Sequence, residues 1–178
     1  MTTGTRTRVT AAGAASLGVA RRVAASVTDP ELPMLTLADL GVLRAVELHG
    51  DSVVVTITPT YSGCPAMATM RADLHVALRR AGFERVDVRT SLSPAWSSDW
   101  ISGRGLAALA EQGISPPQPA VQSAGPIDLV LSIPARLLSC PRCGSFDTGE
   151  LSRFGSTACK SQHVCRACGE PFDHFKEI

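Results

Sequence analysis

The sequence predicts an α+β protein: a small two-layer domain with helices on one face of its sheet, followed by a C-terminal ribbon built on four cysteines. Three observations lead to this prediction. Apolar residues recur at helical intervals in some segments and alternate with polar residues in others. The resulting order of elements is helix, strand, strand, helix, strand, helix, which is typical of an α+β layer. Two Cys-x-x-Cys units then lie near the C-terminus.

The first part of the chain predicts a helix and a hairpin. Residues 14–27 present apolar side chains on one helical face, and the proline-containing run 29–33 ends that helix. Residues 42–48 and 53–58 are rich in Val, Leu and Ile, which favours strands. The polar run 49–52 between them suits a hairpin connection, so we expect the two strands to be antiparallel.

A second helix and a third strand follow. Apolar residues recur at helical spacing from Pro65 to Ala81, and Gly82 provides a natural end. Residues 86–92 alternate between apolar and polar side chains, which predicts a strand with one solvent-facing side. A short helix is expected within residues 97–111.

The chain divides into four predicted parts. Residues 1–12 are expected to form a disordered tail, and residues 13–113 the α+β domain, since about 110 residues suffice for such a core. Residues 114–136 contain five prolines and little periodicity, which indicates a linker, although residues 128–133 could pair as a short edge strand. The ribbon occupies residues 137–178.

Composition places the chain among globular proteins. Its residues are 44% hydrophobic and 19% charged, with a formal net charge of +1. No apolar run approaches the roughly 20 residues that a membrane helix needs, and the N-terminus carries no secretory signal, so we expect a cytoplasmic protein without a membrane partner. In a reducing cytosol, six cysteines are better explained by metal binding or thiol chemistry than by disulfides.

The two Cys-x-x-Cys units predict a metal site. Cys140 and Cys143 form one pair, Cys165 and Cys168 form the other, and a glycine follows each pair. Two cysteines separated by two residues can direct both sulfurs at one ion from a tight turn, and the glycine lets the backbone curl past it. Zinc is the favoured occupant because closed four-cysteine ribbons most often hold it, and an iron–sulfur cluster is the competing occupant.

The ribbon is expected to depend on this metal. Structural zinc contributes on the order of 10 kcal/mol to the folding of small modules. From Cys140 to the C-terminus, five basic residues balance five acidic ones, which leaves no basic surface for nucleic acid. A ribbon that stabilises the chain or docks a protein partner is therefore the favoured interpretation.

Two cysteines remain outside the ribbon pairs. Cys64 lies between a predicted strand and the helix that opens at Pro65, where the helix N-terminus would lower its pKa and suit a reactive or metal-binding thiolate. A small buried apolar residue at this junction is an equal alternative. Cys159 could be idle, could replace a ribbon ligand, or could meet Cys64 to form a transfer site, and the first of these is favoured from the residues alone.

Four further residues allow two interpretations each. Asp29 and Glu31 could hold a metal or cap a helix, but acids between prolines more often form a solvated turn. Trp96 and Trp100 stand one helical turn apart and could anchor a partner protein. Packing of these two rings in the core is at least as well supported.

Several segments resemble known families. Four of them resemble the iron–sulfur assembly family that includes SufT: residues 29–33 (DPELP), 39–42 (DLGV), 56–65 (TITPTYSGCP) and 92–96 (LSPAW). With FGSTACK at 154–160 and CGEPFD at 168–173, the combination is similar to the PaaD family, also called PaaJ, of accessory subunits in the phenylacetyl-CoA epoxidase system. The resemblance covers residues 15–178, and its motifs agree in content and order.

What the resemblance implies is an accessory role in aerobic phenylacetate breakdown, assembling or delivering an iron–sulfur cluster or iron to the epoxidase. The implied clients are the reductase component, which needs a two-iron two-sulfur cluster, and the oxygenase component, which needs a carboxylate-bound di-iron centre. The family's reactive cysteine carries over to Cys64 and its acidic motif to Asp29 and Glu31, with Cys159 as the thiol that could assist. A homodimer is one option for its assembly.

Three hypotheses follow. The leading one is a metallocluster-assembly factor, and the second is a structural or docking subunit with a purely structural zinc. The third is a thiol oxidoreductase that uses a Cys-x-x-Cys pair. The sequence contains no hydrolytic triad, phosphate loop or His-Glu metal motif, so we do not expect an enzyme.

Overall fold

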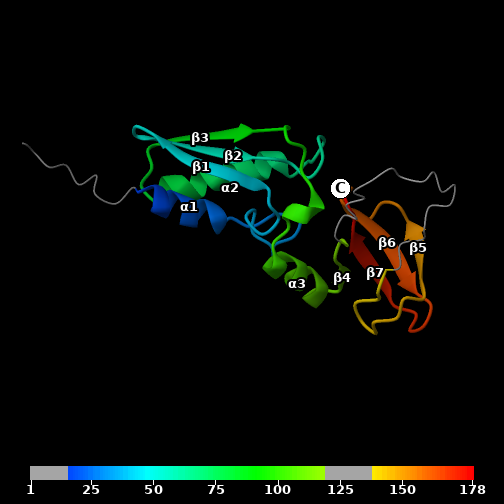
Figure 1. Cartoon of the computed structure of the whole chain (residues 1–178). Helices are drawn as coiled ribbons and strands as arrows, with labels where there is room; N and C mark the ends of the chain where they lie inside the picture. Colours follow the sequence, from blue (N-terminus) through cyan, green and yellow to red (C-terminus); the bar gives the residue numbers. More distant parts are fainter. Residues whose placement is uncertain (1–15, 119–137) are drawn as a thin grey trace, which may run out of the picture.

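A computed structural model of the chain describes residues 16–118 and 138–178 (Figure 1). The predicted tail at residues 1–12 and the edge strand considered for residues 128–133 lie outside the described residues. The described part consists of an N-terminal α+β domain and a C-terminal β-ribbon, as the sequence predicts. Within these ranges, no helix is both long and apolar enough to cross a membrane.

Three strands form the sheet of the first domain. β1 (Leu43–His49) and β2 (Ser52–Ile57) are antiparallel and joined by the predicted hairpin. Gly50 closes this turn at φ 65°, a conformation that L side chains rarely adopt. β3 (Arg85–Thr90) pairs with β2 in parallel, so the strand order is β1-β2-β3 and a helix makes the crossover from β2 to β3.

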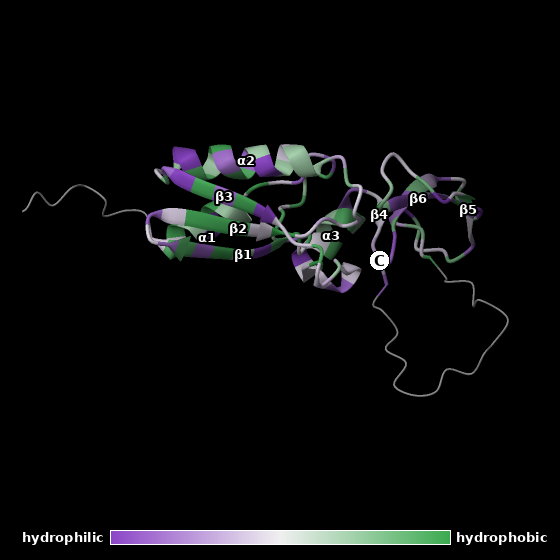
Figure 2. Ribbon diagram, turned by 90° about the horizontal axis from the view of Figure 1, so that it is seen from above, coloured by the Kyte–Doolittle hydropathy of each residue, from purple (hydrophilic) through white to green (hydrophobic). Residues whose placement is uncertain are grey.

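Two helices cover one face of this sheet (Figure 1). α1 (Leu17–Ala25) packs on β1, α2 (Met67–Arg80) packs on β3, and the two helices contact each other. Val53, Val55 and Ile57 of β2 are fully buried in the same apolar cluster as the inner sides of both helices. α2 buries Met70, Leu74 and Leu78, and hydrophilic residues also lie along it (Figure 2), so the core of this domain lies between its two layers.

The helix expected within residues 97–111 is divided into two. η1 (Ser98–Trp100) is a single 3-10 turn, and α3 (Gly103–Glu111) follows it. Ser102 separates them because its Oγ accepts a hydrogen bond from the N–H of Gly105 at 3.0 Å, which makes it the N-cap of α3.

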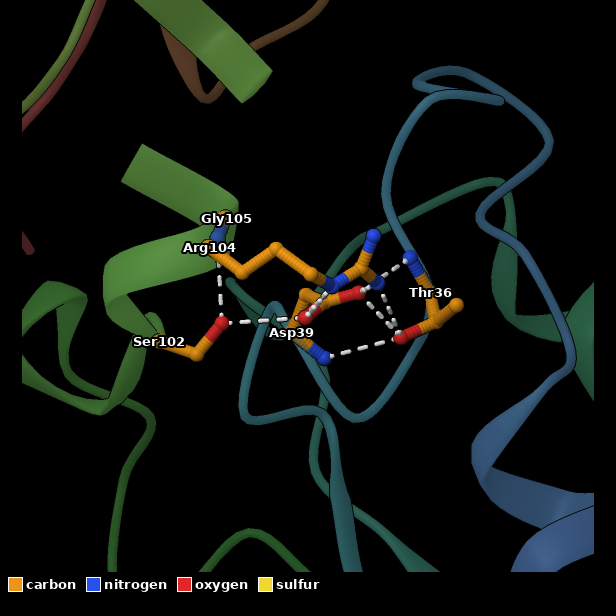
Figure 3. A network of polar contacts seen from close by, with 5 residues as sticks. All are labelled: Thr36, Asp39, Ser102, Arg104 and Gly105. Carbon is orange, nitrogen blue, oxygen red and sulfur yellow. Dashed lines mark hydrogen bonds and ion pairs between the residues drawn. The ribbon is translucent and has the colours of Figure 1, made fainter. Parts of the chain in front are cut away.

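Asp39 joins the loop before β1 to the start of α3 (Figure 3). Its carboxylate accepts hydrogen bonds from Thr36 and from the Ser102 hydroxyl, and it forms an ion pair with Arg104. Because the Asp39 side chain is only 8% exposed, these partners satisfy a charge that would be costly to bury alone. Through Asp39, the segment 39–42 therefore fixes the loop before β1 against the N-terminus of α3.

The ribbon is a four-stranded sheet in the order β4-β7-β6-β5. β5 (Thr148–Ser152), β6 (Lys160–Cys165) and β7 (Pro171–Phe175) are antiparallel neighbours. β4 (Ile114–Ser115) pairs in parallel with β7. The first two residues of the predicted linker, 114–136, therefore belong to the ribbon sheet, because β7 supplies backbone partners that the local sequence cannot reveal.

The ribbon and the first domain share one apolar core. Phe175, at the end of β7, is fully buried, and its ring centroid lies 6.0 Å from that of Trp96. The N–H of Ser98 donates a hydrogen bond to the carbonyl of Ile178 at 3.0 Å. Phe175 and Cys159 also belong to the cluster that contains the buried residues of β2 and α2. The ribbon is consequently docked on the first domain.

Candidate functional site

Four cysteine sulfurs converge at one end of the ribbon. Cys140 and Cys143 lie in the turn that precedes β5, Cys165 ends β6, and Cys168 lies in the turn before β7. All four Sγ atoms lie within 4.8 Å of one another. The Sγ–Sγ distance is 3.8 Å between Cys140 and Cys168 and 3.5 Å between Cys143 and Cys165.

The two turns have the same backbone geometry. Gly144 and Gly169 adopt φ values of 72° and 77°, in the left-handed region. Each glycine N–H donates a hydrogen bond of 2.8 Å to the carbonyl of the first cysteine of its pair, Cys140 or Cys165. The glycines therefore let each turn close around its pair of sulfurs, as their place in the sequence predicts.

This arrangement fits a tetrahedral metal site. With zinc–sulfur bonds of about 2.3 Å, neighbouring sulfurs of a tetrahedron lie about 3.8 Å apart. Burial raises the pKa of Cys165, but the N–H of Cys168 and the neighbouring thiols outweigh it and bring this pKa to about 7. Since metal ligands must be deprotonated, this lowered pKa favours metal binding by Cys165.

Cys64 lies at the carboxyl edge of the parallel strand pair. The chain leaves β2 at Ile57 and reaches α2 at Met67, two residues later than the predicted start at Pro65. Cys64 is half-buried, and its N–H donates a hydrogen bond of 3.1 Å to the carbonyl of Tyr61.

The pKa of the Cys64 thiol is raised. Burial is the largest cause, and the negative charges of Glu31, Asp29 and Cys159 add to it, while the N–H of Ala66 acts in the opposite direction. The expectation that the helix N-terminus lowers this pKa is therefore wrong, because burial and acidic neighbours outweigh it. Cys64 is a thiol that a bound metal would deprotonate.

Cys159 reaches the same place from the ribbon. It lies directly before β6, is 5% exposed, and belongs to the apolar cluster against which Cys64 packs. Its Sγ lies 3.0 Å from Oγ1 of Thr157, and burial raises its pKa. Cys159 stands at the opposite end of β6 from Cys165 and is no member of the four-cysteine group. Cys64 borders the same apolar cluster, and the charge of Cys159 acts to raise its pKa. The alternative in which the two thiols meet to form a transfer site stays a prediction.

The two acids of the 29–33 motif have different positions. Asp29 is 5% exposed, and its Oδ1 accepts hydrogen bonds from the N–H groups of Glu31 at 2.8 Å and Leu32 at 2.9 Å. One oxygen of this carboxylate therefore closes a turn. The Glu31 carboxylate acts electrostatically on both Cys64 and Cys159, and burial raises its own pKa.

Lys160 also belongs to this site and was not identified from the sequence. It is 6% exposed, and its Nζ lies 3.1 Å from Oδ2 of Asp173. Its ammonium acts to lower the pKa of both Glu31 and Cys159. A buried lysine is rare without a partner. Lys160 could have been identified from the sequence because it ends the FGSTACK motif at residues 154–160, which also contains Cys159.

The two tryptophans do not form an exposed anchor. Trp96 is 4% exposed, and its Nε1 donates a hydrogen bond of 2.9 Å to the carbonyl of Leu40. Trp100 lies beneath the guanidinium of Arg44, which is 3.6 Å from the ring centroid. Core packing, the alternative interpretation, is confirmed for Trp96.

Comparison with known sequences identifies both parts of the chain. Residues 21–89, which include Cys64, match the family described as iron-sulfur cluster assembly protein, and residues 130–176 match the PaaD zinc beta ribbon domain. An Escherichia coli (strain K12) protein, named as a subunit of 1,2-phenylacetyl-CoA epoxidase, is 43% identical over 152 residues, which is 85% of this chain and 87% of that protein. The chain belongs to the PaaD family. The PaaD resemblance seen in the sequence motifs is thereby confirmed.

Solved structures similar to the PaaD-family chain cover about half of it. One is a domain of unknown function, DUF59, from Bacillus anthracis, with 25% identity, 52% of this chain and 89% of that chain covered, and a TM-score of 0.48. Another is a conserved hypothetical protein from Thermotoga maritima, with 22% identity, 52% and 92% covered, and a TM-score of 0.46.

Proposed function

We propose that this PaaD-family protein is a cytoplasmic accessory factor in aerobic phenylacetate degradation. It assembles or delivers an iron–sulfur cluster, or iron, to the phenylacetyl-CoA epoxidase complex, through the reductase or the oxygenase subunit. It performs none of the oxygenation chemistry itself. Cys64 and Cys159 hold the cargo transiently, and Glu31 assists them. The four-cysteine site holds a structural zinc.

The observation that supports this proposal is that Cys64 borders the apolar cluster in which Cys159 is buried and that the charge of Cys159 acts on Cys64. The two thiols come from different parts of the chain, yet both pack on one cluster, beside the Glu31 carboxylate. A transfer site needs soft ligands that are incompletely coordinated, so that a client can take the metal over. Two thiols and one carboxylate meet that need, whereas four converging cysteines would hold a metal firmly.

The test replaces Cys64 by Ser and measures the client proteins. Epoxidase components from cells that carry Cys64→Ser should contain less iron and show less activity, because one of the two transfer ligands is lost. Cys159→Ser should act in the same direction. Ser62→Ala, an exposed change in the same loop, is the matched control and should leave client iron unchanged. Full iron content in the Cys64→Ser cells would rule out transfer through this thiol.

A docking subunit is the second candidate, and one observation favours it. The ribbon exposes three large apolar side chains around β5: Phe146 is 58% exposed, Leu151 61% and Phe154 66%. Such residues are typical of protein-binding surfaces. Stable co-purification with the epoxidase at fixed stoichiometry, kept by Cys64→Ser and lost in Phe154→Ala, would support docking as the main function.

A further inference from the structure

One strand connects the two cysteine sites. β6 begins directly after Cys159 and ends at Cys165, one of the four converging cysteines. Its six residues span roughly 20 Å at about 3.3 Å per residue. The position of Cys159 is therefore determined by a strand whose far end lies at the four-cysteine site.

The neighbouring strand makes the same connection. β7 starts after the Cys168 turn and ends at Phe175, which lies opposite Lys160 in the register. Directly beyond it, the N–H of Lys176 donates a hydrogen bond of 2.9 Å to the carbonyl of Cys159. Both strands that hold Cys159 thus meet at the turn formed by Cys165 and Cys168.

The two ends of this hairpin differ in apolar packing. At the four-cysteine end, the buried cluster among the described residues consists of Cys140, Cys165 and Phe172. A core of this size cannot hold a fold without a metal. At the other end, Cys159 and Phe175 belong to the large core of the first domain. Loss of the metal would release the turn that joins β6 to β7, while most of the core of the first domain would remain packed.

We infer that occupancy of the four-cysteine site controls whether Cys159 stays buried in the apolar cluster that Cys64 borders. The chain must then bind its structural metal before it can hold cargo on two thiols. This order of loading rests on the proposed function, which is what identifies the cargo as iron or an iron–sulfur cluster. The placement of Cys159 is a property of the protein alone and can be measured without any client.

Thiol alkylation of the full-length protein tests the inference. Zinc-loaded and chelator-treated protein are alkylated for increasing times, and the labelling of each cysteine is followed by peptide mass spectrometry. Removal of the metal should raise the labelling rate of Cys159 by at least about tenfold, because local opening exposes a thiol that is now 5% exposed. Hydrogen exchange, measured in parallel, should become much faster in β6 and β7 than in α2, because α2 loses only the part of its core that Phe175 supplies.

Two variants separate the metal from the thiols. Cys168→Ser removes an exposed ligand and should reproduce the effect of the chelator. Cys64→Ser, which leaves all four ribbon cysteines in place, should retain the metal and the protection of Cys159. Adding one equivalent of Zn²⁺ back should restore that protection in the chelated wild-type protein and fail to restore it in Cys168→Ser.

Two results would overturn the inference. Equal labelling of Cys159 with and without metal would mean that packing of Phe175 on Trp96 holds this thiol by itself. Loss of protection in α2 to the same extent as in β6 would mean that the metal supports the whole fold rather than the hairpin. A different result would contradict the proposed function. In that case the iron content of the client proteins would be normal in Cys64→Ser cells, although the alkylation of Cys159 still depended on the metal.

Discussion

At the scale of residues, Asp29 shows why an acidic motif need not be a metal ligand. One of its oxygens accepts two backbone N–H groups, and the side chain lies in a buried turn. Burial raises the pKa of Asp29 above its ordinary value, and the two hydrogen bonds only partly offset this effect. Among the described acids, Glu31 is the one whose charge acts on both thiols.

Asp29→Asn should stabilise the protein at pH 7. A raised pKa in the folded state means that protonation of Asp29 favours folding, so wild-type stability from this group is lost as pH rises through the folded pKa. Asn keeps the hydrogen-bonding oxygen without the buried charge. Urea unfolding should therefore give a higher free energy of unfolding for Asp29→Asn at pH 7, with a smaller advantage as the pH falls.

The control for this prediction is Asp51→Asn. Asp51 is 72% exposed and pairs with an exposed arginine, so its replacement should change stability little at either pH. A lower stability of Asp29→Asn than of wild type at pH 7 would contradict the prediction and would indicate that the charge itself holds the turn.

At the scale of elements, the turns between strands were the most predictable features. Gly50, Gly82, Gly144 and Gly169 all have positive φ, at the turns and the helix end that the sequence indicated. Local chemistry decides such positions, because a left-handed backbone penalises every side chain. The two-residue strand β4 was not predictable, since its pairing with β7 joins residues nearly sixty positions apart.

Gly169→Ala should weaken metal binding. The φ of 77° costs an L side chain about 1–2 kcal/mol, which corresponds to a loss of roughly 5- to 30-fold in affinity if the apo ribbon is unfolded. Competition with a chromophoric chelator measures this change. Gly103→Ala is the matched control, because its added Cβ also meets open space but its φ is ordinary. Equal zinc affinity in both variants would show that the turn adapts at no cost.

In the whole molecule, the ribbon and the first domain share one apolar core. Phe175 from the last strand is the largest fully buried side chain among the described residues and packs against Trp96 of the first domain. Stability of the first domain should therefore depend on a residue of the ribbon, although more than eighty positions separate Phe175 from the strands of the first sheet.

Phe175→Ala should destabilise both parts together. Removing a buried phenylalanine ring costs about 3–5 kcal/mol, and the cavity would open in the shared core. Hydrogen exchange in α2 should become faster even with the ribbon metal bound. Phe154→Ala removes the same ring from a residue that is 66% exposed, so it should cost less than about 1 kcal/mol and leave α2 unchanged. Slow exchange in α2 of Phe175→Ala would show that the two parts are independently stable.

The class of the fold, the hairpin, the helix between the second and third strands and the clustering of four cysteines could all be predicted from the sequence. Each depends on spacing within a short segment, and short-range geometry leaves few alternatives. Three further facts appear only in the folded chain: Cys159 is buried in the apolar cluster that Cys64 borders, Lys160 is buried and paired with Asp173, and the Cys64 pKa is raised. Those facts depend on how the ribbon docks on the first domain, because burial and the charges of distant segments act only once the chain has folded.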